Sequence, residues 1–262
     1  MSAARTRAAL VTGGSSGIGL ALALALAEDG YGVTVAGRDA GRLAAAADAA
    51  RARGLELLPV PADVSREDDV RALVAAHCER HGRLDVLVNS AGGGGGGTGV
   101  DALPTELLDT NLAVNLRAPF LTTRECLPLL LTAGAEHGKA LLVNVSSVAA
   151  RLGPPTMSAY AAAKAGVLSL TASTRAQVRG RGVQVTALVP GFTATPMTAW
   201  TEGLGLPPGD LIQPSDLVLA LRFLLATSAS CEVPEIDFAS PAADAFLAGA
   251  AFHDAGGFGA AG

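Results

Sequence analysis

The sequence predicts an α/β fold in which a parallel sheet is covered by helices on both faces. Short, wholly apolar segments alternate with helical patterns along most of the chain, and strands of that kind are typical of sheets buried on both faces. A glycine-rich turn follows the first apolar segment, where such folds pass from strand to helix. With 262 residues, of which 50% are hydrophobic and 16% charged, the chain can enclose one large core.

The order of the segments predicts a doubly wound, Rossmann-like sheet of about seven strands in a single domain, 1–262. The predicted strands are Ala8–Val11, Gly32–Ala36, Leu55–Val60, Leu84–Val88, Ala140–Val145, Val183–Val189 and Val233–Phe238. The predicted helices are Gly17–Asp29, Ala40–Arg53, Arg66–His81, Pro104–Leu131, Ser158–Arg179 and Ser215–Leu225. In the third helix, one apolar stripe is formed by Val70, Leu73, Val74 and Cys78. The Ala/Gly-rich tail, 239–262, receives no assignment.

Composition narrows the classes of partner. The net charge of −5 argues against a nucleic-acid surface. No secretory signal and no apolar stretch of about 18 residues is visible, so we expect a soluble cytoplasmic protein without a membrane partner. The three cysteines form no CxxC motif and are expected to be reduced. The four histidines form no metal pattern, so we expect no metal and place them at the surface: His77, His81, His137 and His253.

Six consecutive glycines, Gly92–Gly97, follow the fourth predicted strand. That position is the carboxyl edge of the sheet, where ligands bind in such folds. Two interpretations stay open: a mobile loop beside a ligand, or a neutral expansion in a tolerant loop.

The glycine-rich turn after the first strand predicts a dinucleotide site. Glycines allow a tight turn, a close approach of backbone to phosphate and close helix packing, and the N–H groups of the helix N-terminus face the pyrophosphate. The strand before and the helix after the turn supply the context that this motif requires. The residues expected to bind the cofactor here are Gly13, Ser15, Ser16, Gly17, Ile18 and Gly19.

The end of the second strand predicts the choice of cofactor. Gly37 leaves no carboxylate where a site for NAD usually holds the ribose hydroxyl, and Arg38 follows at once. A guanidinium binds a 2′-phosphate with two hydrogen bonds, so NADP(H) is favoured. NAD(H) stays possible because Asp39 comes next. After the third strand, Asp63 and Val64 are placed to contact the adenine, although Asp63 could equally cap the next helix.

A tyrosine and a lysine four residues apart, Tyr160 and Lys164, share one face of a predicted helix. A free phenol is a poor base at neutral pH, and a nearby ammonium favours its ionised form. Ser147 lies thirteen residues before the tyrosine, just past the fifth strand, and its hydroxyl can polarise a carbonyl beside the phenol.

These motifs together resemble the short-chain dehydrogenase/reductase family over nearly the full chain. They stand in the family's order: Thr12-Gly13-x-x-x-Gly17-x-Gly19, Asn89-Ser90-Ala91-Gly92, Asn115, Ser147, Tyr160-x-x-x-Lys164 and Pro190-Gly191. The resemblance implies a cofactor half at about 1–150 and a catalytic and substrate half at about 140–240. It extends the expected cofactor-binding set by Asn89, Ala91, Gly92, Tyr160, Lys164, Pro190, Gly191, Thr193 and Thr195.

The resemblance also implies roles. Tyr160 would be the acid/base, and Lys164 would hold the nicotinamide ribose and lower the tyrosine pKa. Ser147 would orient the substrate, and Asn115 would hold a water that relays protons to solvent. Thr195 and nearby backbone would fix the carboxamide of the cofactor.

Two departures from the family pattern stand out. Ser90 replaces an asparagine, which affects packing more than catalysis. Val233–Phe238 replaces a Val-Asp-Gly-Gly-like end and resembles NADP-dependent reductases of small hydroxy acids or aldehydes rather than fatty-acid-type ketoacyl reductases.

The expected function is hydride transfer between NADP(H) and a small carbonyl or alcohol substrate. An epimerase that acts through a keto intermediate and a non-catalytic dinucleotide sensor are the alternatives. The resemblance implies a homotetramer or homodimer, paired through the predicted helices Pro104–Leu131 and Ser158–Arg179, which are expected to carry excess apolar surface.

Overall fold

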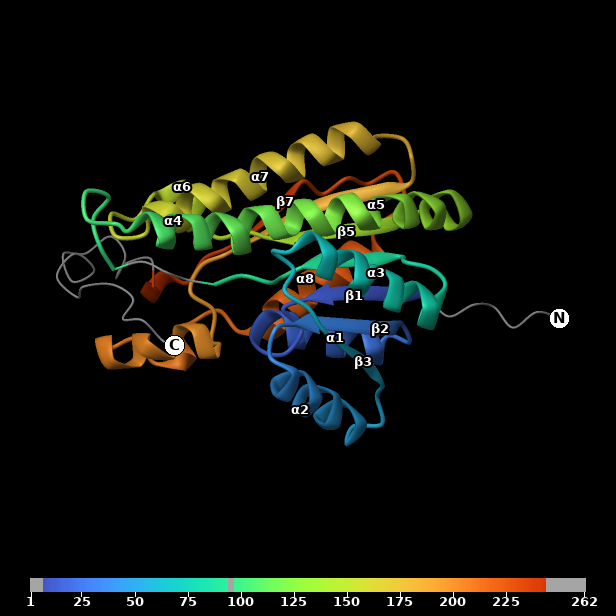
Figure 1. Ribbon diagram of the computed structural model, residues 1–262, viewed down its shortest axis with the longest axis horizontal. Helices are drawn as coiled ribbons and strands as arrows, with labels where there is room; N and C mark the ends of the chain where they lie inside the picture. Colours follow the sequence, from blue (N-terminus) through green and yellow to red (C-terminus); the bar gives the residue numbers. More distant parts are fainter. Residues whose placement is uncertain (1–6, 94–96, 244–262) are drawn as a thin grey trace.

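The computed structural model describes residues 7–93 and 97–243. Seven parallel strands form one sheet in the order β3-β2-β1-β4-β5-β6-β7, as a doubly wound fold requires (Figure 1). The strands are β1 Ala8–Thr12, β2 Gly32–Gly37, β3 Leu57–Pro61, β4 Val86–Asn89, β5 Ala140–Val145, β6 Val183–Pro190 and β7 Glu235–Phe238. The predicted Rossmann-like, single-domain architecture is confirmed.

Helices cover both faces of the sheet. One face packs against α1 Gly17–Glu28, α2 Ala40–Arg51 and α8 Pro214–Ala226. The other packs against α3 Glu67–His81, α5 Ala118–His137 and α7 Ser158–Val178. The remaining elements are α4 Thr105–Leu112, the π-helical segment η1 Ala113–Arg117, α6 Ala149–Leu152, and the 3₁₀ segments η2 Pro196–Leu204 and η3 Pro208–Asp210.

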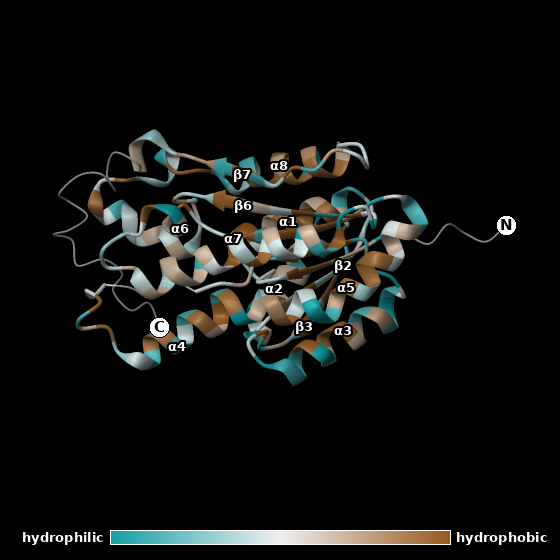
Figure 2. Ribbon diagram, turned by 90° about the horizontal axis from the view of Figure 1, so that it is seen from above, coloured by the Kyte–Doolittle hydropathy of each residue, from teal (hydrophilic) through white to brown (hydrophobic). Residues whose placement is uncertain are grey.

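The core consists of two apolar layers, one on each side of the sheet. Along β1, Ala9 and Val11 belong to the layer under α1, whereas Leu10 belongs to the layer under α5. This alternation follows from the two-residue period of a strand. Figure 2 shows hydrophobic strands between helices that carry hydrophilic residues on parts of their surface. Burial on both sides explains why the central strands β1, β4, β5 and β6 are mostly apolar, whereas the edge strands β3 and β7 are only partly buried.

The predicted helix Pro104–Leu131 is the element that differs most from expectation. The structure divides it into α4, η1 and α5, and α5 continues to His137 with Pro128 in its interior. A π-helical turn inserts about one extra residue, and such insertions are frequent at functional sites. The apolar pattern did not reveal this insertion, because hydrophobic residues stay frequent on both sides of it.

The expectation that the histidines lie at the surface is wrong for His77. Its side chain is fully buried and bridges the hydroxyl of Thr34, at 2.8 Å, and the carbonyl of Arg83, at 2.9 Å. His77 lies seven residues after Val70, so it shares the apolar stripe of α3. His81 is half-buried, His137 is exposed as expected, and His253 lies outside the described residues.

The structure also bears on the cysteines, on membrane-crossing helices and on two segments of the chain. All three cysteines are free thiols. Within residues 7–93 and 97–243, no helix has both the length and the apolar character that crossing a bilayer requires. The tail from residue 244 onward and the central glycines of the Gly92–Gly97 run, 94–96, lie outside the described residues.

Candidate active site

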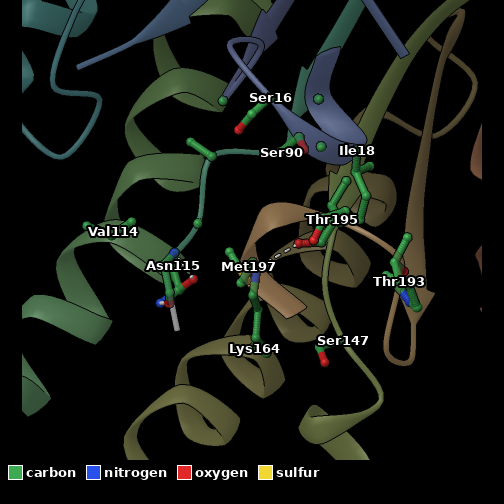
Figure 3. A pocket seen from close by; sticks show the side chains of 18 of the residues that line it. Ser16, Ile18, Ser90, Val114, Asn115, Ser147, Lys164, Thr193, Thr195 and Met197 are labelled. Carbon is green, nitrogen blue, oxygen red and sulfur yellow. Dashed lines mark hydrogen bonds between the residues drawn. The ribbon is translucent and has the colours of Figure 1, made fainter. Parts of the chain in front are cut away.

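A deep pocket opens at the carboxyl edge of the sheet, where β1, β2, β3, β4, β5 and β6 end (Figure 3). It runs from the β2–α2 junction, across the glycine-rich turn, to the segment around α6 and η2. The predicted site residues that line it are Gly13, Ser15, Ser16, Gly17, Ile18, Gly19, Arg38, Asp63, Val64, Ala91, Gly92, Asn115, Ser147, Tyr160, Lys164, Pro190, Gly191, Thr193 and Thr195.

The glycine-rich turn is packed too tightly for side chains. Gly13 has a φ of 69°, and a Cβ there would lie 2.8 Å from the Cα of Ala91. A Cβ on Gly19 would lie 2.3 Å from the carbonyl oxygen of Gly13. The turn therefore leads directly into α1, whose first N–H groups have no partner within the helix. These N–H groups, beside the hydroxyls of Ser15 and Ser16, suit a diphosphate.

Asp39, the residue that left NAD(H) possible, is engaged in the structure. It is the N-cap of α2 and accepts a hydrogen bond from the backbone N–H of Arg42 at 2.9 Å. The Arg42 guanidinium also lies 3.6 Å from the other carboxylate oxygen of Asp39. Arg38 and Arg42 both line the pocket, so two guanidinium groups flank its adenosine end. The sequence analysis did not single out Arg42, although its spacing of four from Arg38 is visible.

Asp63 orders the turn that precedes α3 but is not the N-cap of that helix, and its contact to the adenine stays a prediction. Its carboxylate accepts hydrogen bonds from the backbone N–H of Ser65, at 3.0 Å, and from the Ser65 hydroxyl, at 2.7 Å. It thus orders the turn before α3, whose N-cap is Arg66. Both Asp63 and Val64 also line the pocket.

Ser147, Tyr160 and Lys164 meet in the pocket because β5 and α7 end and begin at the same edge of the sheet. Ser147 follows β5, and Tyr160 lies in the first turn of α7. Burial raises the pKa of the Tyr160 phenol, whereas a side-chain hydrogen bond with Ser147 acts in the opposite direction. A raised pKa keeps the phenol protonated at neutral pH, so it can donate a proton.

Lys164 lies behind the tyrosine, one helical turn along α7. Its Nζ donates a hydrogen bond to the carbonyl oxygen of Val145 at 2.9 Å, and its side chain is only 5% exposed. Desolvation lowers the pKa of the ammonium to about 8. In this structure, burial therefore governs the pKa of Tyr160, and the lowering by Lys164 that the family resemblance implies stays a prediction.

Asn115 lies on the π-helical segment and forms hydrogen bonds with the loop that follows β4. Its amide nitrogen donates to the carbonyl of Gly93 at 2.9 Å and to that of Asn111 at 3.1 Å, and its amide oxygen accepts from the Gly93 N–H at 3.3 Å. A Cβ on Gly92 would lie 3.0 Å from this oxygen. Asn115 thus positions the start of the glycine run, and its role as a water ligand stays a prediction.

Asn89 is the one predicted site residue that does not line the pocket. Its side chain is buried and accepts from Thr122 at 2.6 Å and donates to Asn144 at 2.9 Å. Asn144 in turn donates to Thr171 at 2.9 Å. This chain of hydrogen bonds joins α5, β4, β5 and α7 beneath the pocket. A signal for this chain was present in the sequence, because each asparagine lies at or next to the end of its predicted strand, and the two pair in register on adjacent strands.

The segment after β6 is ordered by a hydroxyl that sequence reasoning missed. Thr198 Oγ1 accepts from the backbone N–H of Thr195 at 3.2 Å and donates to the carbonyl of Thr193. Figure 3 shows Thr193, Thr195 and Met197 on this side of the pocket. Trp200 packs edge-on against Phe192, with ring centres 5.7 Å apart, so it supports the wall that Phe192 forms.

The described part of the chain contains no group of three His, Cys, Asp or Glu side chains arranged to hold a metal ion. The chemistry that the pocket offers comes from hydroxyl groups, one ammonium and two guanidinium groups.

Comparisons with known proteins agree with this arrangement. A family model described as short chain dehydrogenase matches residues 7–202. A 2-(R)-hydroxypropyl-CoM dehydrogenase of Xanthobacter autotrophicus is 40% identical over 198 residues, which cover 74% of this chain and 78% of that protein.

Two solved structures share the fold over most of their length. A 3-ketoacyl-(acyl-carrier-protein) reductase from Brucella melitensis, complexed with NADH, is 31% identical with a TM-score of 0.81, covering 90% of this chain and 97% of that chain. A variant of an actinorhodin polyketide ketoreductase, with NADPH, is 30% identical with a TM-score of 0.81, covering 92% and 98%. The first is named a ketoacyl reductase and the second a polyketide ketoreductase, whereas Val233–Phe238 resembles reductases of small hydroxy acids or aldehydes, so these observations point to different substrate classes.

Proposed function

Because the chain belongs to the short-chain dehydrogenase/reductase family, we propose that it is an NADP(H)-dependent oxidoreductase that interconverts a ketone or aldehyde and an alcohol. The meeting of Ser147, Tyr160 and Lys164 in one open pocket carries the proposal. The donor set fits a dinucleotide: helix N–H groups and hydroxyls for the diphosphate, guanidinium groups for a 2′-phosphate, and a buried ammonium for a ribose.

The reaction needs a proton at the oxygen where negative charge develops. A reduced nicotinamide, when bound, supplies the hydride that the carbonyl carbon receives. As the C=O π electrons pass to oxygen, Tyr160 gives its phenolic proton to that oxygen, and Ser147 stabilises the charge by a hydrogen bond. The phenol then regains a proton from solvent. Lys164 holds the ribose and, as a cation, stabilises the phenolate that forms during the cycle.

The preference for NADP(H) rests on the charges at the adenosine end. Arg38 and Arg42 together place two permanent cations there. The carboxylate of Asp39, which would repel a phosphate, is paired with Arg42 and caps α2. The three charged side chains that follow β2, Arg38, Asp39 and Arg42, thus sum to one positive charge, and the loss of the 2′-phosphate in NAD(H) forfeits charge-assisted contacts to the two guanidinium groups.

Assembly is part of the proposal. We propose a homotetramer or homodimer, because exposed large apolar side chains outside the pocket include Phe120 on α5 and both Leu219 and Phe223 on α8. In the described residues, α7 exposes no large apolar side chain, so its expected excess of apolar surface is not found. A closed symmetric oligomer would cover such patches. The free thiols fit the proposed cytoplasmic location.

The direct test is a panel of ketones, aldehydes and secondary alcohols, with NADPH absorbance as the readout. The proposal expects stoichiometric consumption of NADPH with at least one carbonyl compound. Interconversion of two alcohols without net consumption would favour the epimerase instead. Binding of dinucleotide with no turnover of any substrate would favour the non-catalytic sensor.

A further inference from the structure

The charged residues of the pocket gather at one end. Arg38, Asp39 and Arg42 follow β2, and Asp63 follows β3, at one edge of the sheet. Lys164 lies in the middle and is held by the carbonyl of Val145. The opposite end is lined from β5, α6, β6 and η2.

That opposite end is apolar in the part of the chain that the structure describes. Beyond the hydroxyls of Ser147 and Tyr160, its walls are formed by Val148, Leu152, Pro154, Met157, Phe192 and Met197. Met197, Ser147 and Lys164 line the same pocket (Figure 3). None of these walls carries a charge, so only the reacting carbonyl meets polar groups.

Two of the wall residues are unusually exposed for apolar side chains. Leu152 on α6 is 59% exposed and Met197 on η2 is 47% exposed. They come from segments far apart in the sequence and line the same pocket. Exposed apolar side chains that gather at a pocket mark a surface that a ligand covers.

The nearest cation in the sequence is turned elsewhere. Arg151 precedes Leu152 but does not line the pocket. Its guanidinium pairs with Glu235 and lies 3.3 Å from the carboxylate of Asp237, both on β7. The Arg151 guanidinium therefore forms its ion pairs with the last strand of the sheet, β7.

Two stretches that lie outside the described residues, 94–96 and 244–262, add no further Lys or Arg. Residues 94–96 are glycines, and the stretch 244–262 contains neither Lys nor Arg. An anionic group on the substrate would therefore lose its hydration without gaining an ion pair, which is strongly unfavourable.

From these observations we propose that the substrate is an uncharged ketone with an apolar arm, and that the pocket discriminates against ketones bearing a carboxylate, sulfonate or phosphate. The inference rests on the proposed function and narrows it. Hydride and proton add to the carbonyl carbon and oxygen as above, while the arm lies against Leu152, Met157 and Met197. Small hydroxy acids, which the end of the sequence suggested, do not fit this end of the pocket.

The test compares two ketones of equal length, 2-octanone and 7-oxooctanoate, which differ only in a terminal methyl or carboxylate group. We expect kcat/KM with NADPH to be at least about 10²-fold higher for 2-octanone. Within the series from 2-butanone to 2-octanone, kcat/KM should rise about fourfold per methylene until the pocket is filled.

A charged variant should change this selectivity. Leu152→Arg should raise kcat/KM for 7-oxooctanoate and reduce the preference by about tenfold or more, because it provides the missing cation. Ala75→Arg adds the same charge at an exposed position of α3, outside the pocket lining, and should leave the preference unchanged.

Binding separates failure of this inference from failure of the proposed function. Calorimetry with the NADP⁺ complex measures the affinity of each ketone without chemistry. If 7-oxooctanoate binds or reacts as well as 2-octanone, the inference is overturned while the proposed function stands. If 2-octanone binds selectively but no ketone oxidises NADPH, the inference stands and the proposed function fails. If neither ketone binds, the inference is overturned.

Discussion

The ammonium nitrogen of Lys164 lies 5.6 Å from the centre of the Tyr160 ring, one turn away on the same helix. The lysine is anchored to the end of β5 by the carbonyl of Val145, so strand and helix together set its distance from the phenol. Both groups are partly or wholly removed from water, and their pKa values shift in opposite directions.

Tyr160→Phe removes the proton donor and retains the ring. We expect kcat to fall on the order of 10²-fold or more, since positioned acid/base catalysis contributes 10²–10⁴, with folding and dinucleotide affinity preserved. Alcohol oxidation by the wild type should rise on the alkaline side as the phenol ionises, and this limb should vanish in the variant. The chain has one other tyrosine, Tyr31, packed beside the core, so Tyr31→Phe is the matched control. Near wild-type turnover in Tyr160→Phe would overturn the assignment.

Lys164 should make cofactor affinity depend on pH. Its pKa of about 8 means that the ammonium is present below that pH and lost above it. The Kd for NADPH, followed by nicotinamide fluorescence from about pH 6.5 to about pH 9.5, should therefore increase above about 8. Lys164→Met should bind weakly with little pH dependence over this window. Lys164→Arg should restore charge but not full activity, because the guanidinium differs in reach and geometry. If the Kd of Lys164→Met for NADPH depends on pH as it does in the wild type, the Lys164 ammonium does not hold the cofactor.

Arg38 and Arg42 should determine the choice between NADPH and NADH. Arg38→Asp should reverse the preference, so that kcat/KM becomes higher with NADH than with NADPH. Arg42→Ala should lower the ratio of kcat/KM with NADPH to kcat/KM with NADH by about tenfold, the value of one charge-assisted hydrogen bond. Arg51→Ala is the control, because Arg51 ends the same helix and pairs only with Asp48 among the described contacts. A wild-type enzyme that already prefers NADH would contradict the argument from both arginines.

His77 should make the folded protein sensitive to acid. Burial lowers its pKa from 6.5 to about 4, so between these values the unfolded chain binds a proton that the folded protein excludes. Stability is therefore lost as the pH falls from about 6.5 to about 4, by up to about 3 kcal/mol. Urea unfolding across this range should show a shallower pH dependence in His77→Gln than in the wild type. The control His137→Gln, on α5, should keep the wild-type dependence of the unfolding free energy on pH. If all three proteins show the same dependence, His77 is not the source of the acid sensitivity.

Much of the fold could be predicted from the sequence because the relevant signals are local. The buried central strands are short, mostly apolar runs. The glycine spacing from Thr12 to Gly19 indicates a tight turn between a strand and a helix. The spacing of Tyr160 and Lys164 is fixed by one helix, so their neighbourhood was also predictable.

The contacts that were missed join segments far apart in the sequence. Asn115 clasps Gly93 from 22 positions away, and no local pattern records which backbone an amide side chain will meet. The pairing of Asp39 with Arg42 is a local exception, three residues apart, and it depends on where α2 begins. His77 was within reach of prediction, since the apolar stripe of α3 passes through it, but a polar side chain in a stripe is buried only when partners such as Thr34 satisfy it.

The π-helical segment has a consequence for how the two halves of the long helix face their neighbours. Each residue of an α-helix advances by about 100° around the axis, and the wider π-helical turn takes up about one extra residue within roughly the same rotation. The segments on its two sides therefore keep their neighbours, with α4 on α7 and α5 on β4 and β5, while the apolar pattern of the sequence shifts by one position at Ala113–Arg117. Deleting one residue within this segment should convert it into regular α-helix and leave Thr105–Leu112 packed on α7.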